Sequence, residues 1–505
     1  MARKIPPCPR KARSLSRSAC NEIALIYQKI CDLTKERLSA CHRANREHDP
    51  LISNLPNEIV AKIFTHFSEI SDNTDGVFIN RYFVPVGNRK KRIIATPMLL
   101  GAVCTAWRDI AWSTPQLWNF IPINLAENVS LGFVRKWLAR SGELPLYLDI
   151  YILNAHPGKK PLQEKVLELF ASYASRWFSL TLSIQNPTLL QHLFCEGKDP
   201  LLLHNLKIDG DVSTGIHLGR TPNLREIIIY NSLNIFKLLH LDFGKVTVLK
   251  CVFTSIDDAL QVFLNLSSLT HFTFHFENEY AELQTVQHTY IEHHSLAFLY
   301  IKLWSKPMNT TISWLKLPAL QYLVLDSRLL GNVVDIAGLV KRSSCAIKIL
   351  EVSVSESKLH YSLSPPLLPQ GYEPILEVLQ NIPSIETLEF SSSYLCFGIL
   401  LDPLLIMLSN TASTLDFLPN LKSLRMIQIP FTHKCLIDMI QAHLTVSQIL
   451  ATSAMEVSQP GRPLCLLHVD IGHKSHRKMD ESMKEEISKY VTLANAAGFK
   501  ITFNS

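Results

Sequence analysis

The sequence predicts an α/β protein in which a helical N-terminal part precedes a long array of strand-and-helix repeats. Three observations predict this fold class. Hydrophobic residues make up 47% of the 505 residues and charged residues 19%, which is typical of a chain that folds. Segments near the N-terminus space their apolar residues as a helix does. After about residue 140, one short apolar pattern recurs eleven times.

The N-terminal segment 1–18 is predicted to be a disordered basic arm. Residues 1–50 hold 11 Lys/Arg against 5 Asp/Glu, and the rest of the chain holds 39 of each sign, so the net charge of +6 belongs to this end. Pro6, Pro7 and Pro9 oppose a helix here. A solvated tail is the favoured interpretation. A nuclear address, a weak contact with a polyanion and a mitochondrial presequence are the alternatives.

Residues 19–48 are predicted to form one helix, because they contain no Pro or Gly. Their apolar residues follow the a/d spacing of a heptad at Ile23, Ile26, Ile30 and Leu33. The seam then weakens at Arg37, Ala40 and Ala44. We therefore favour a single helix packed on the rest of the chain over a dimerising coiled coil. Asp49-Pro50 predicts the end of this helix.

Residues 51–118 are predicted to form a helical module. Pro56 and Glu58 indicate a helix start, and an apolar stripe follows at Ile59, Val60, Ile63, Phe64 and Phe67. A second stripe contains Leu99, Leu100, Val103, Trp107, Ile110 and Ala111. Between them, the polar insertion 70–95 predicts a solvated loop. Its basic run 89–92 is interpreted as a loop tip, with a nuclear signal as the alternative.

Residues 140–505 carry the repeated pattern, in which apolar residues stand three and five positions after a first apolar residue. The first positions are Trp177, Leu203, Leu224, Val246, Leu269, Leu296, Leu320, Ile347, Ile385, Leu421 and Leu464. The steps between them are 21–27 residues as far as Ile347 and 36–43 beyond it. Leucine-rich repeats have periods of about 20–29 residues. The longer steps predict insertions.

The repeats predict an irregular leucine-rich-repeat-like solenoid. Each unit supplies a short strand whose alternate side chains point inward, and a return segment, such as the predicted helices Ala259–Leu264 and Pro374–Gln380, covers the other side. No unit can bury its apolar face alone, so neighbours must stack. The Asn or Cys of the repeat consensus is missing from all eleven units, which predicts less regular turns. A pair of ordinary α/β domains is the alternative.

Motifs of bond chemistry are missing from the sequence: it has no GxGxxG, no phosphate-binding GxxxxGK, no GxSxG and no HExxH. His271 and His275 would lie about 13 Å apart on one strand, too far for one metal. The stretch with His468, His473 and His476 has no matching acidic cluster. We therefore expect neither a metal site nor a cofactor, and a non-catalytic protein. An enzyme with a motif-free, scattered active site stays the alternative.

The eleven cysteines are widely spaced and form no CxxC. A disulfide framework or a zinc module would cluster them, so we expect reduced thiols and a cytoplasmic or nuclear location. The longest nearly apolar stretch, 93–104, is interrupted by Thr96 and Pro97 and is shorter than the roughly 20 residues of a membrane span. The N-terminus has no apolar core of a signal peptide, so we expect neither membrane insertion nor secretion.

Three strings in the module resemble an F-box protein. Ile52–Phe64, ISNLPNEIVAKIF, resembles the opening of an F-box, and Val103–Ala111, VCTAWRDIA, resembles its closing helix, V-C-x-x-W-R-x-I-A. Thr114–Trp118, TPQLW, is similar to the T-P-x-L-W that follows the F-box in the large families of mushroom-forming fungi. Those proteins also tend to carry a degenerate leucine-rich-repeat C-terminus. The insertion 70–95 departs from the usual F-box length, which puts the strength of adaptor binding in question.

The resemblance implies a substrate-recognition subunit of a Skp-cullin-F-box ubiquitin ligase, with a Skp adaptor and a cullin scaffold as partners. The positions that match the family's docking residues are Leu55, Pro56, Ile59, Ile63, Phe64, Val103 and Trp107. The alternative for these residues is the internal core of the module, and a module this small can use one residue for both roles. A repeat scaffold without ubiquitylation output is the alternative function.

In this interpretation an unknown protein substrate binds the concave face of the repeats, and nucleic acid is not an expected partner. Residues between the inward positions of the strands would line that face, and aromatic and Arg residues are enriched at binding hot spots. Tyr300, Tyr322 and Arg425 are therefore the predicted substrate contacts. Their alternative is solvent-facing decoration.

Overall fold

The computed structural model divides into two compact units, Met1–Ile123 with Asn128–Asp149, and Asn124–Glu127 with Ile150–Ser505. The structure describes residues 17–73, 96–127, 129–152, 160–184, 186–194, 197–210, 216–232, 243–253, 256–276, 290–303, 312–327, 334–354, 373–392, 401–412, 416–429, 431–452, 464, 466–470, 485, 488–493 and 500–504. Residues 1–16 of the predicted basic arm and most of the predicted insertion lie outside the described residues, and the last two residues of the arm belong to the first helix.

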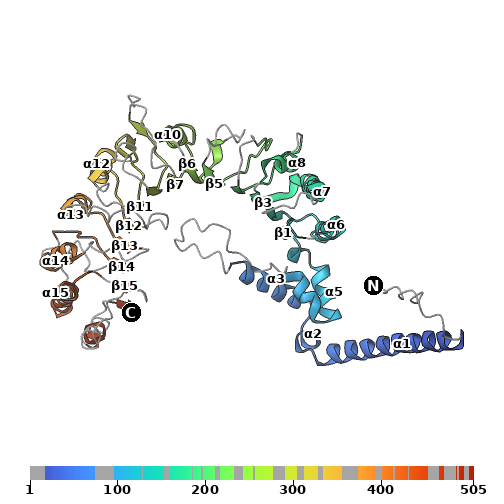
Figure 1. Ribbon diagram of the computed structural model, residues 1–505. Coiled ribbons are helices and arrows are strands. Elements are labelled where there is room, and N and C mark those ends of the chain that lie inside the picture. Colours follow the sequence, from blue (N-terminus) through green and yellow to red (C-terminus); the bar gives the residue numbers. More distant parts are fainter. Residues whose placement is uncertain are drawn as a thin grey trace. The chain divides into compact units, whose positions relative to one another are not determined.

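The first unit begins with helices (Figure 1). They are α1 (Arg17–His48), α2 (Pro50–Asn54), α3 (Asn57–Asn73), α4 (Thr96–Val103) and α5 (Thr105–Ser113). The helix stop predicted at Asp49-Pro50 is confirmed, since α1 ends at His48. Asp49 then caps α2, because its Oδ1 accepts hydrogen bonds from the backbone N–H groups of Leu51 at 3.0 Å and Ile52 at 3.4 Å.

The same unit continues beyond the helices with η2 (Pro115–Leu117), β1 (Phe120–Asn124), α6 (Leu131–Arg140) and the start of β2 (Leu146–Ile152). We did not predict β1 from the sequence. Trp118, Ile121 and Ile123 nevertheless have the spacing of the eleven repeats, and all three are buried. The repeat pattern therefore begins two strands earlier than expected, at β1, and β2 was not predicted either.

The second unit contains one long parallel sheet, so the predicted α/β class is confirmed. Its strands are β3 (Trp177–Ile184), β4 (Asn205–Gly210), β5 (Glu226–Ser232), β6 (Val248–Phe253), β7 (His271–Phe276), β9 (Phe298–Leu303), β11 (Tyr322–Ser327), β12 (Ile349–Val354), β13 (Thr387–Ser392), β14 (Ser423–Ile427), β15 (Leu466–Asp470) and β16 (Lys500–Asn504). They pair in this order. Parallel pairing of strands that follow one another requires a crossover after each strand.

Each of the eleven predicted first positions lies at the start of a strand or two residues before it, and all eleven are buried. The expected strand register is confirmed as well. Leu224, Ile227 and Ile229 are buried as expected, and Ile227 stands in register with Leu206 on β4 and Leu249 on β6. The core is therefore a stack of inward side chains repeated from strand to strand.

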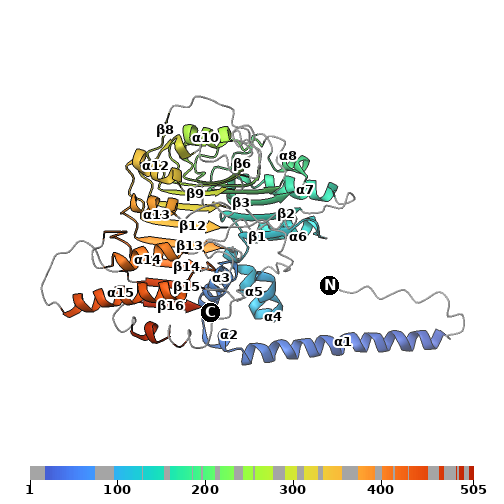
Figure 2. The ribbon, with the colours of Figure 1, turned by 60° about the vertical axis from the view of Figure 1, so that its left-hand side comes forward.

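Helices of the second unit lie along one side of the sheet, as Figures 1 and 2 show. They are α7 (Lys160–Ala171), α8 (Leu190–Leu193), α10 (Ile256–Asn265), α12 (Val334–Ser343), α13 (Glu373–Gln380), α14 (Asp402–Asn410) and α15 (His433–Thr452). The helices predicted at Ala259–Leu264 and Pro374–Gln380 are confirmed as α10 and α13. The other side of the sheet carries the polar positions of the strands and is called the open face below.

No helix among the described residues is long and apolar enough to cross a membrane.

Candidate functional site

Helix α3 separates its apolar residues onto two faces. Its first turn is closed by the carbonyl of Pro56, which accepts hydrogen bonds from the N–H groups of Ile59 at 3.0 Å and Val60 at 3.1 Å. Val60 and Phe64 are fully buried, whereas Ile59, Ile63 and Phe67 are 40–51% exposed. Residues four apart share one side of a helix. The three exposed residues therefore form one continuous apolar stripe.

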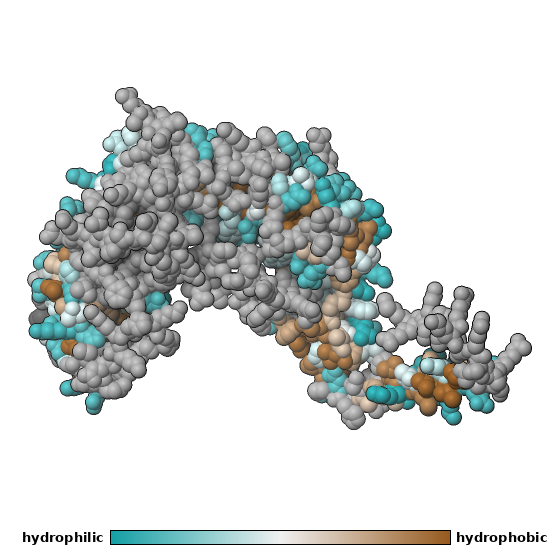
Figure 3. All heavy atoms as spheres, viewed as in Figure 1, coloured by the Kyte–Doolittle hydropathy of each residue, from teal (hydrophilic) through white to brown (hydrophobic). Residues whose placement is uncertain are grey.

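Helix α4 carries two further exposed apolar residues. It contacts α3, and its Leu99 and Val103 are 45% and 56% exposed. Ile59, Ile63, Phe67, Leu99 and Val103 are together called the apolar stripe below. Figure 3 shows hydrophobic residues on the surface of this part of the first unit. Exposed apolar patches on a folded unit commonly mark places where another protein binds.

A short break between α4 and α5 positions Trp107. Cys104 is extended, with φ −154°, and its Sγ accepts a hydrogen bond from the backbone N–H of Trp107 at 3.4 Å. The Trp107 ring packs on Phe64 with the ring centroids 4.8 Å apart. Its indole N–H donates to Asp49, the cap of α2. Trp107 therefore holds α2, α3 and α5 together and is half-buried.

The structure divides the seven predicted adaptor-binding residues. Ile59, Ile63 and Val103 belong to the exposed apolar stripe, and Pro56 is also exposed. Phe64 lies in the core with 1% exposure, and Leu55 and Trp107 are half-buried. The sequence prediction of docking residues did not include Phe67 and Leu99. Their spacing of four from Ile63 and Val103 is the signal that places them on the same stripe.

The T-P-x-L-W segment ties the end of α5 to the rest of the first unit. Thr114 Oγ1 donates to the Ile110 carbonyl at 2.7 Å, and the Trp118 indole donates to the Ala111 carbonyl at 2.8 Å. The Arg140 guanidinium from α6 lies 4.6 Å from the Trp118 ring centroid, within cation–π range. The segment is therefore structural, with Thr114, Leu117 and Trp118 buried in the interior.

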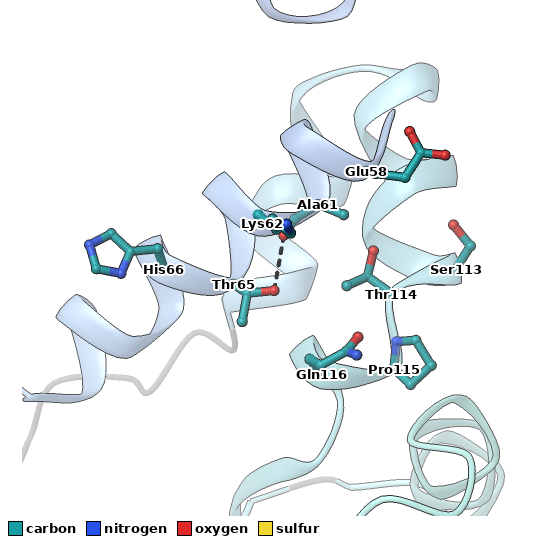
Figure 4. Close-up of a pocket in the computed structure, with 9 residues that line it drawn as sticks. All are labelled: Glu58, Ala61, Lys62, Thr65, His66, Ser113, Thr114, Pro115 and Gln116. Carbon is teal, nitrogen blue, oxygen red and sulfur yellow. Dashed lines mark hydrogen bonds between the residues drawn. The ribbon is translucent and has the colours of Figure 1, made fainter. Parts of the chain in front are cut away.

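A polar hollow of about 560 Å³ lies between α3 and the end of α5 (Figure 4). Its lining comprises Glu58, Ala61, Lys62, Thr65, His66, Ser113, Thr114, Pro115 and Gln116. The hydroxyl groups in it donate to helix carbonyls, as Thr65 does to Ala61 at 2.9 Å and Ser113 to Asp109 at 2.8 Å. These hydroxyls cap helical turns, and the hollow holds no arrangement of nucleophile, base and anion-binding donors.

The open face of the sheet carries the predicted substrate residues. Tyr300, Tyr322 and Arg425 lie at half-exposed positions of β9, β11 and β14. Tyr300 stands in register with Thr273 on β7 and Val324 on β11. The predicted register is therefore correct for all three residues, whose side chains alternate with the buried core positions.

Each of the three side chains bonds a buried carboxylate. The Tyr300 hydroxyl donates to Asp326 Oδ2 at 3.1 Å, and the Tyr322 hydroxyl donates to Glu351. Arg425 donates to Glu389 Oε2 at 2.9 Å. Lys302 also approaches Asp326, with 3.0 Å between Nζ and Oδ2. The polar ends of these side chains thus stabilise the open face, which leaves the phenol rings and part of the Arg425 side chain accessible.

Burial and neighbouring charge shift the pKa of groups on this face. Glu351 and Glu389 are register partners on adjacent strands, which lie about 4.8 Å apart. Burial, and then the charge of Glu351, raise the pKa of Glu389, while Arg425 opposes the shift. On β7, burial and the nearby charge of Lys302 lower the pKa of His275 to about 3, so His275 is neutral at physiological pH.

Within the part of the chain that the structure describes, neither the polar hollow nor the open face forms a metal site. Among the described residues, no group of three or more His, Cys, Asp or Glu side chains has a geometry that could hold a metal ion. His473 and His476 lie outside the described residues. His468 is placed on β15, and its Nδ1 lies 2.6 Å from the Thr502 hydroxyl of β16. His468 thus contributes to the contact between the last two strands.

No protein-family model matches the chain, and none of the curated proteins matches it either. Among solved structures, the chain is similar to one described as "Crystal structure of Rad7 and Elc1 complex in yeast". The two are 12% identical, and the match covers 92% of this chain and 97% of that chain with a TM-score of 0.29. At so low a TM-score, fold and function have to be argued from the residues of this chain alone.

Proposed function

We propose that the chain is the substrate-recognition subunit of a Skp-cullin-F-box ubiquitin ligase. In this proposal the first unit contains an F-box module that docks the Skp adaptor. The sheet of the second unit is an irregular leucine-rich-repeat-like solenoid, and its open face binds a protein substrate. The proposed location is the cytoplasm or the nucleus, where such a ligase works.

The apolar stripe carries this proposal. It lies on the helices whose sequence resembles the two halves of an F-box, and its five large side chains are 40–56% exposed. Exposed apolar side chains contribute free energy when a partner covers them, at about 25 cal/mol per Å². Phe64 and Trp107, which pack inside the module, support the stripe from beneath. These contacts provide the rigid apolar surface that an adaptor helix requires.

The chain would supply no bond chemistry in this role. A receptor accelerates ubiquitin transfer by raising the effective concentration of the substrate near the ubiquitin-loaded enzyme. The requirements are an adaptor contact on one unit and a substrate contact on the other. The proposal therefore needs no metal, cofactor or catalytic residue from this chain, and a cullin scaffold would be the second partner.

The substrate surface proposed on the open face consists of the faces of two phenol rings and part of an Arg side chain, and less of the tyrosine hydroxyl groups. The hydroxyl groups of Tyr300 and Tyr322 already bond Asp326 and Glu351. A substrate would then pack on the two phenol rings and on the Arg425 side chain, which is 43% exposed. Rigid aromatic rings are well suited to this because they lose little conformational entropy on binding.

Affinity purification of the tagged full-length chain tests the proposal. We expect a Skp adaptor and a cullin to co-purify with the wild-type chain, and both to be lost together from the variant Ile59→Asp/Ile63→Asp. Adaptor without cullin would instead identify a scaffold without ubiquitylation output. Absence of both from the wild-type complex would refute the proposed function. Peptide identification in the same sample would give the substrate.

A further inference from the structure

Helix α1 presents an apolar face that no described residue of the first unit covers. Its described side chains are exposed throughout, and Ile23, Ile26, Ile30 and Leu33 are 43–58% exposed. The expectation that this helix packs on the residues that follow is therefore wrong for the described part of the first unit. Hydrophobic residues along α1 are visible in Figure 3. An isolated helix is marginally stable in water unless tertiary packing supports its apolar face, so α1 needs a partner.

The face to be covered is the heptad seam, because the opposite side of α1 is mostly polar, with Leu25 and Leu38 as exposed apolar exceptions. On that opposite side, the Gln28 amide donates to Asp32 Oδ2 at 3.2 Å, and Lys35 Nζ lies 3.4 Å from Asp32 Oδ1. These three residues occupy the outward positions of the heptads that place Ile23 and Ile30 at a, and Ile26 and Leu33 at d. The polar network and the seam thus divide the helix into two sides.

The charged residues that flank the seam indicate that its partner is a second copy of α1. The g positions, immediately before the a positions, are Glu22, Lys29, Glu36 and Arg43. In an antiparallel pair of α1 helices, g positions face g positions. Centring the pair near Asp32 then places Glu22 opposite Arg43 of the second copy and Lys29 opposite Glu36 of the second copy. All four facing pairs have opposite charges.

The same alignment fills the seam. Two Ile30–Leu33 layers form the centre, with Ile23 against Ala40 at each end. Between them Ile26 meets Arg37, whose aliphatic stem can cover it while the guanidinium reaches water. A parallel pair would place Arg37 against Arg37 in the seam. It would also place the g charges opposite the uncharged e residues, which are Tyr27, Thr34 and Cys41.

We propose that α1 is a self-association element, through which two copies of the chain join by an antiparallel two-helix coiled coil. The weak half of each seam, from Arg37 onward, meets the strong half of the other copy, so the two halves complement each other. The seam has only six layers, two of them containing Arg37, so the dimer dissociates on dilution. This proposal does not depend on the proposed ligase function.

Sedimentation of the purified full-length chain over a range of concentrations tests self-association. We expect a monomer–dimer equilibrium in the wild-type chain and a monomer in the variant Ile30→Asp/Leu33→Asp. Reversing one charge, Lys29→Glu or Glu36→Lys, creates two like-charge pairs and should weaken dimerisation about tenfold. The combined variant Lys29→Glu/Glu36→Lys should restore it, because the pairs are again opposite in charge.

A wild-type chain that stays monomeric at tens of micromolar would overturn the proposal, and so would a combined variant as weak as either single reversal. Disulfide cross-linking tests the orientation in a chain whose Cys20, Cys31 and Cys41 are replaced by Ser. With diamide as oxidant, a copy with Ile30→Cys should cross-link to a differently tagged copy with Leu33→Cys. Cross-linking of Ile30→Cys copies only to each other would show a parallel pair and refute the antiparallel arrangement.

Discussion

Single residues on the open face show how polar groups fix a parallel sheet. Asp326, Glu351 and Glu389 are buried on three neighbouring strands, and each is bonded by a tyrosine or a cation from an adjacent strand. A buried carboxylate that loses a hydrogen-bond or ion-pair partner is destabilised or takes up a proton. Tyr300, Tyr322 and Arg425 therefore stabilise the sheet, whatever they bind.

This arrangement changes what an alanine variant reports. If Tyr300, Tyr322 and Arg425 faced only solvent or substrate, replacing all three by Ala would leave stability intact. The register is correct, yet the triple variant removes a partner from each of three buried carboxylates. Tyr→Phe and Arg→Lys changes separate the roles better, because they retain the ring or the charge. The bonded partners are 24 or more residues away in sequence, so no local pattern could reveal them.

Glu389→Gln should change how stability depends on pH. Because the pKa of Glu389 is raised in the folded chain, the folded state binds its proton more tightly than the unfolded state, whose pKa is close to 4.5. The wild-type chain should therefore lose stability at this site as the pH rises above about 4.5. Gln does not titrate, so the difference in melting temperature between variant and wild type should shift in favour of the variant from pH 4.5 to pH 7. Parallel melting curves across that range would contradict the raised pKa.

Arg425→Ala tests the other side of the same ion pair. We expect the variant to lose about 1–3 kcal/mol of stability at pH 7, because Glu389 remains buried next to Glu351. Arg425→Lys is the matched control and should lose less, since a charge remains. Melting of both variants near pH 5 gives the check: the Ala variant should recover part of its loss as Glu389 takes up a proton. A stability loss that is equal at both pH values would exclude the charge of the buried Glu389 as its cause.

At the scale of elements, α3 shows two faces that the sequence could not separate. The periodicity predicted one apolar stripe through Ile59, Val60, Ile63, Phe64 and Phe67, and left docking and core as alternatives for its members. The structure assigns Val60 and Phe64 to the core and Ile59, Ile63 and Phe67 to the surface. On a helical wheel the five residues occupy one continuous arc of about 140°, and the wheel alone does not show which part of that arc is covered. It depends on where α4 and α5 pack.

Phe64→Ala should therefore mainly lower stability, whereas Ile63→Ala should mainly weaken adaptor binding. Removing the Phe64 ring leaves a cavity beside Trp107 and should cost about 3–5 kcal/mol of stability. Removing the exposed Ile63 side chain should change stability by less than about 0.5 kcal/mol and should weaken adaptor binding instead. Thermal unfolding and adaptor binding of both variants provide the test. Equal destabilisation by the two changes would mean that α3 is packed on both faces.

A strand could be predicted from the sequence where all three apolar positions of its repeat are present. Eleven strands begin where the pattern placed them, because burial of the same three positions recurs in every unit. The last strand, β16, was missed: two residues before its start, where most of the predicted strands have an apolar first position, the sequence has Gly498. In β1 the pattern is present at Trp118, Ile121 and Ile123, but it overlaps the end of the helical module, at a distance from the other repeats.

At the scale of the whole molecule, the chain combines three surfaces with separate tasks. The apolar stripe is proposed to bind the adaptor, the open face the substrate, and the seam of α1 a second copy. The sequence indicated the first two through a family resemblance and a repeat pattern. Which side chains remain exposed could be seen only in the folded units, because exposure depends on residues that are distant in sequence.

Adaptor binding by the apolar stripe is the central claim, and a titration of the full-length chain with purified Skp adaptor tests it most directly. We expect the wild-type chain to bind and Ile59→Asp/Ile63→Asp to lose at least a hundredfold in affinity, since hot-spot losses of about 2–4 kcal/mol per residue are typical. Leu162→Asp, which charges an exposed Leu on α7, is the matched control and should bind as the wild type does. Wild-type affinity in the double variant, with melting behaviour unchanged, would contradict the F-box assignment of this unit.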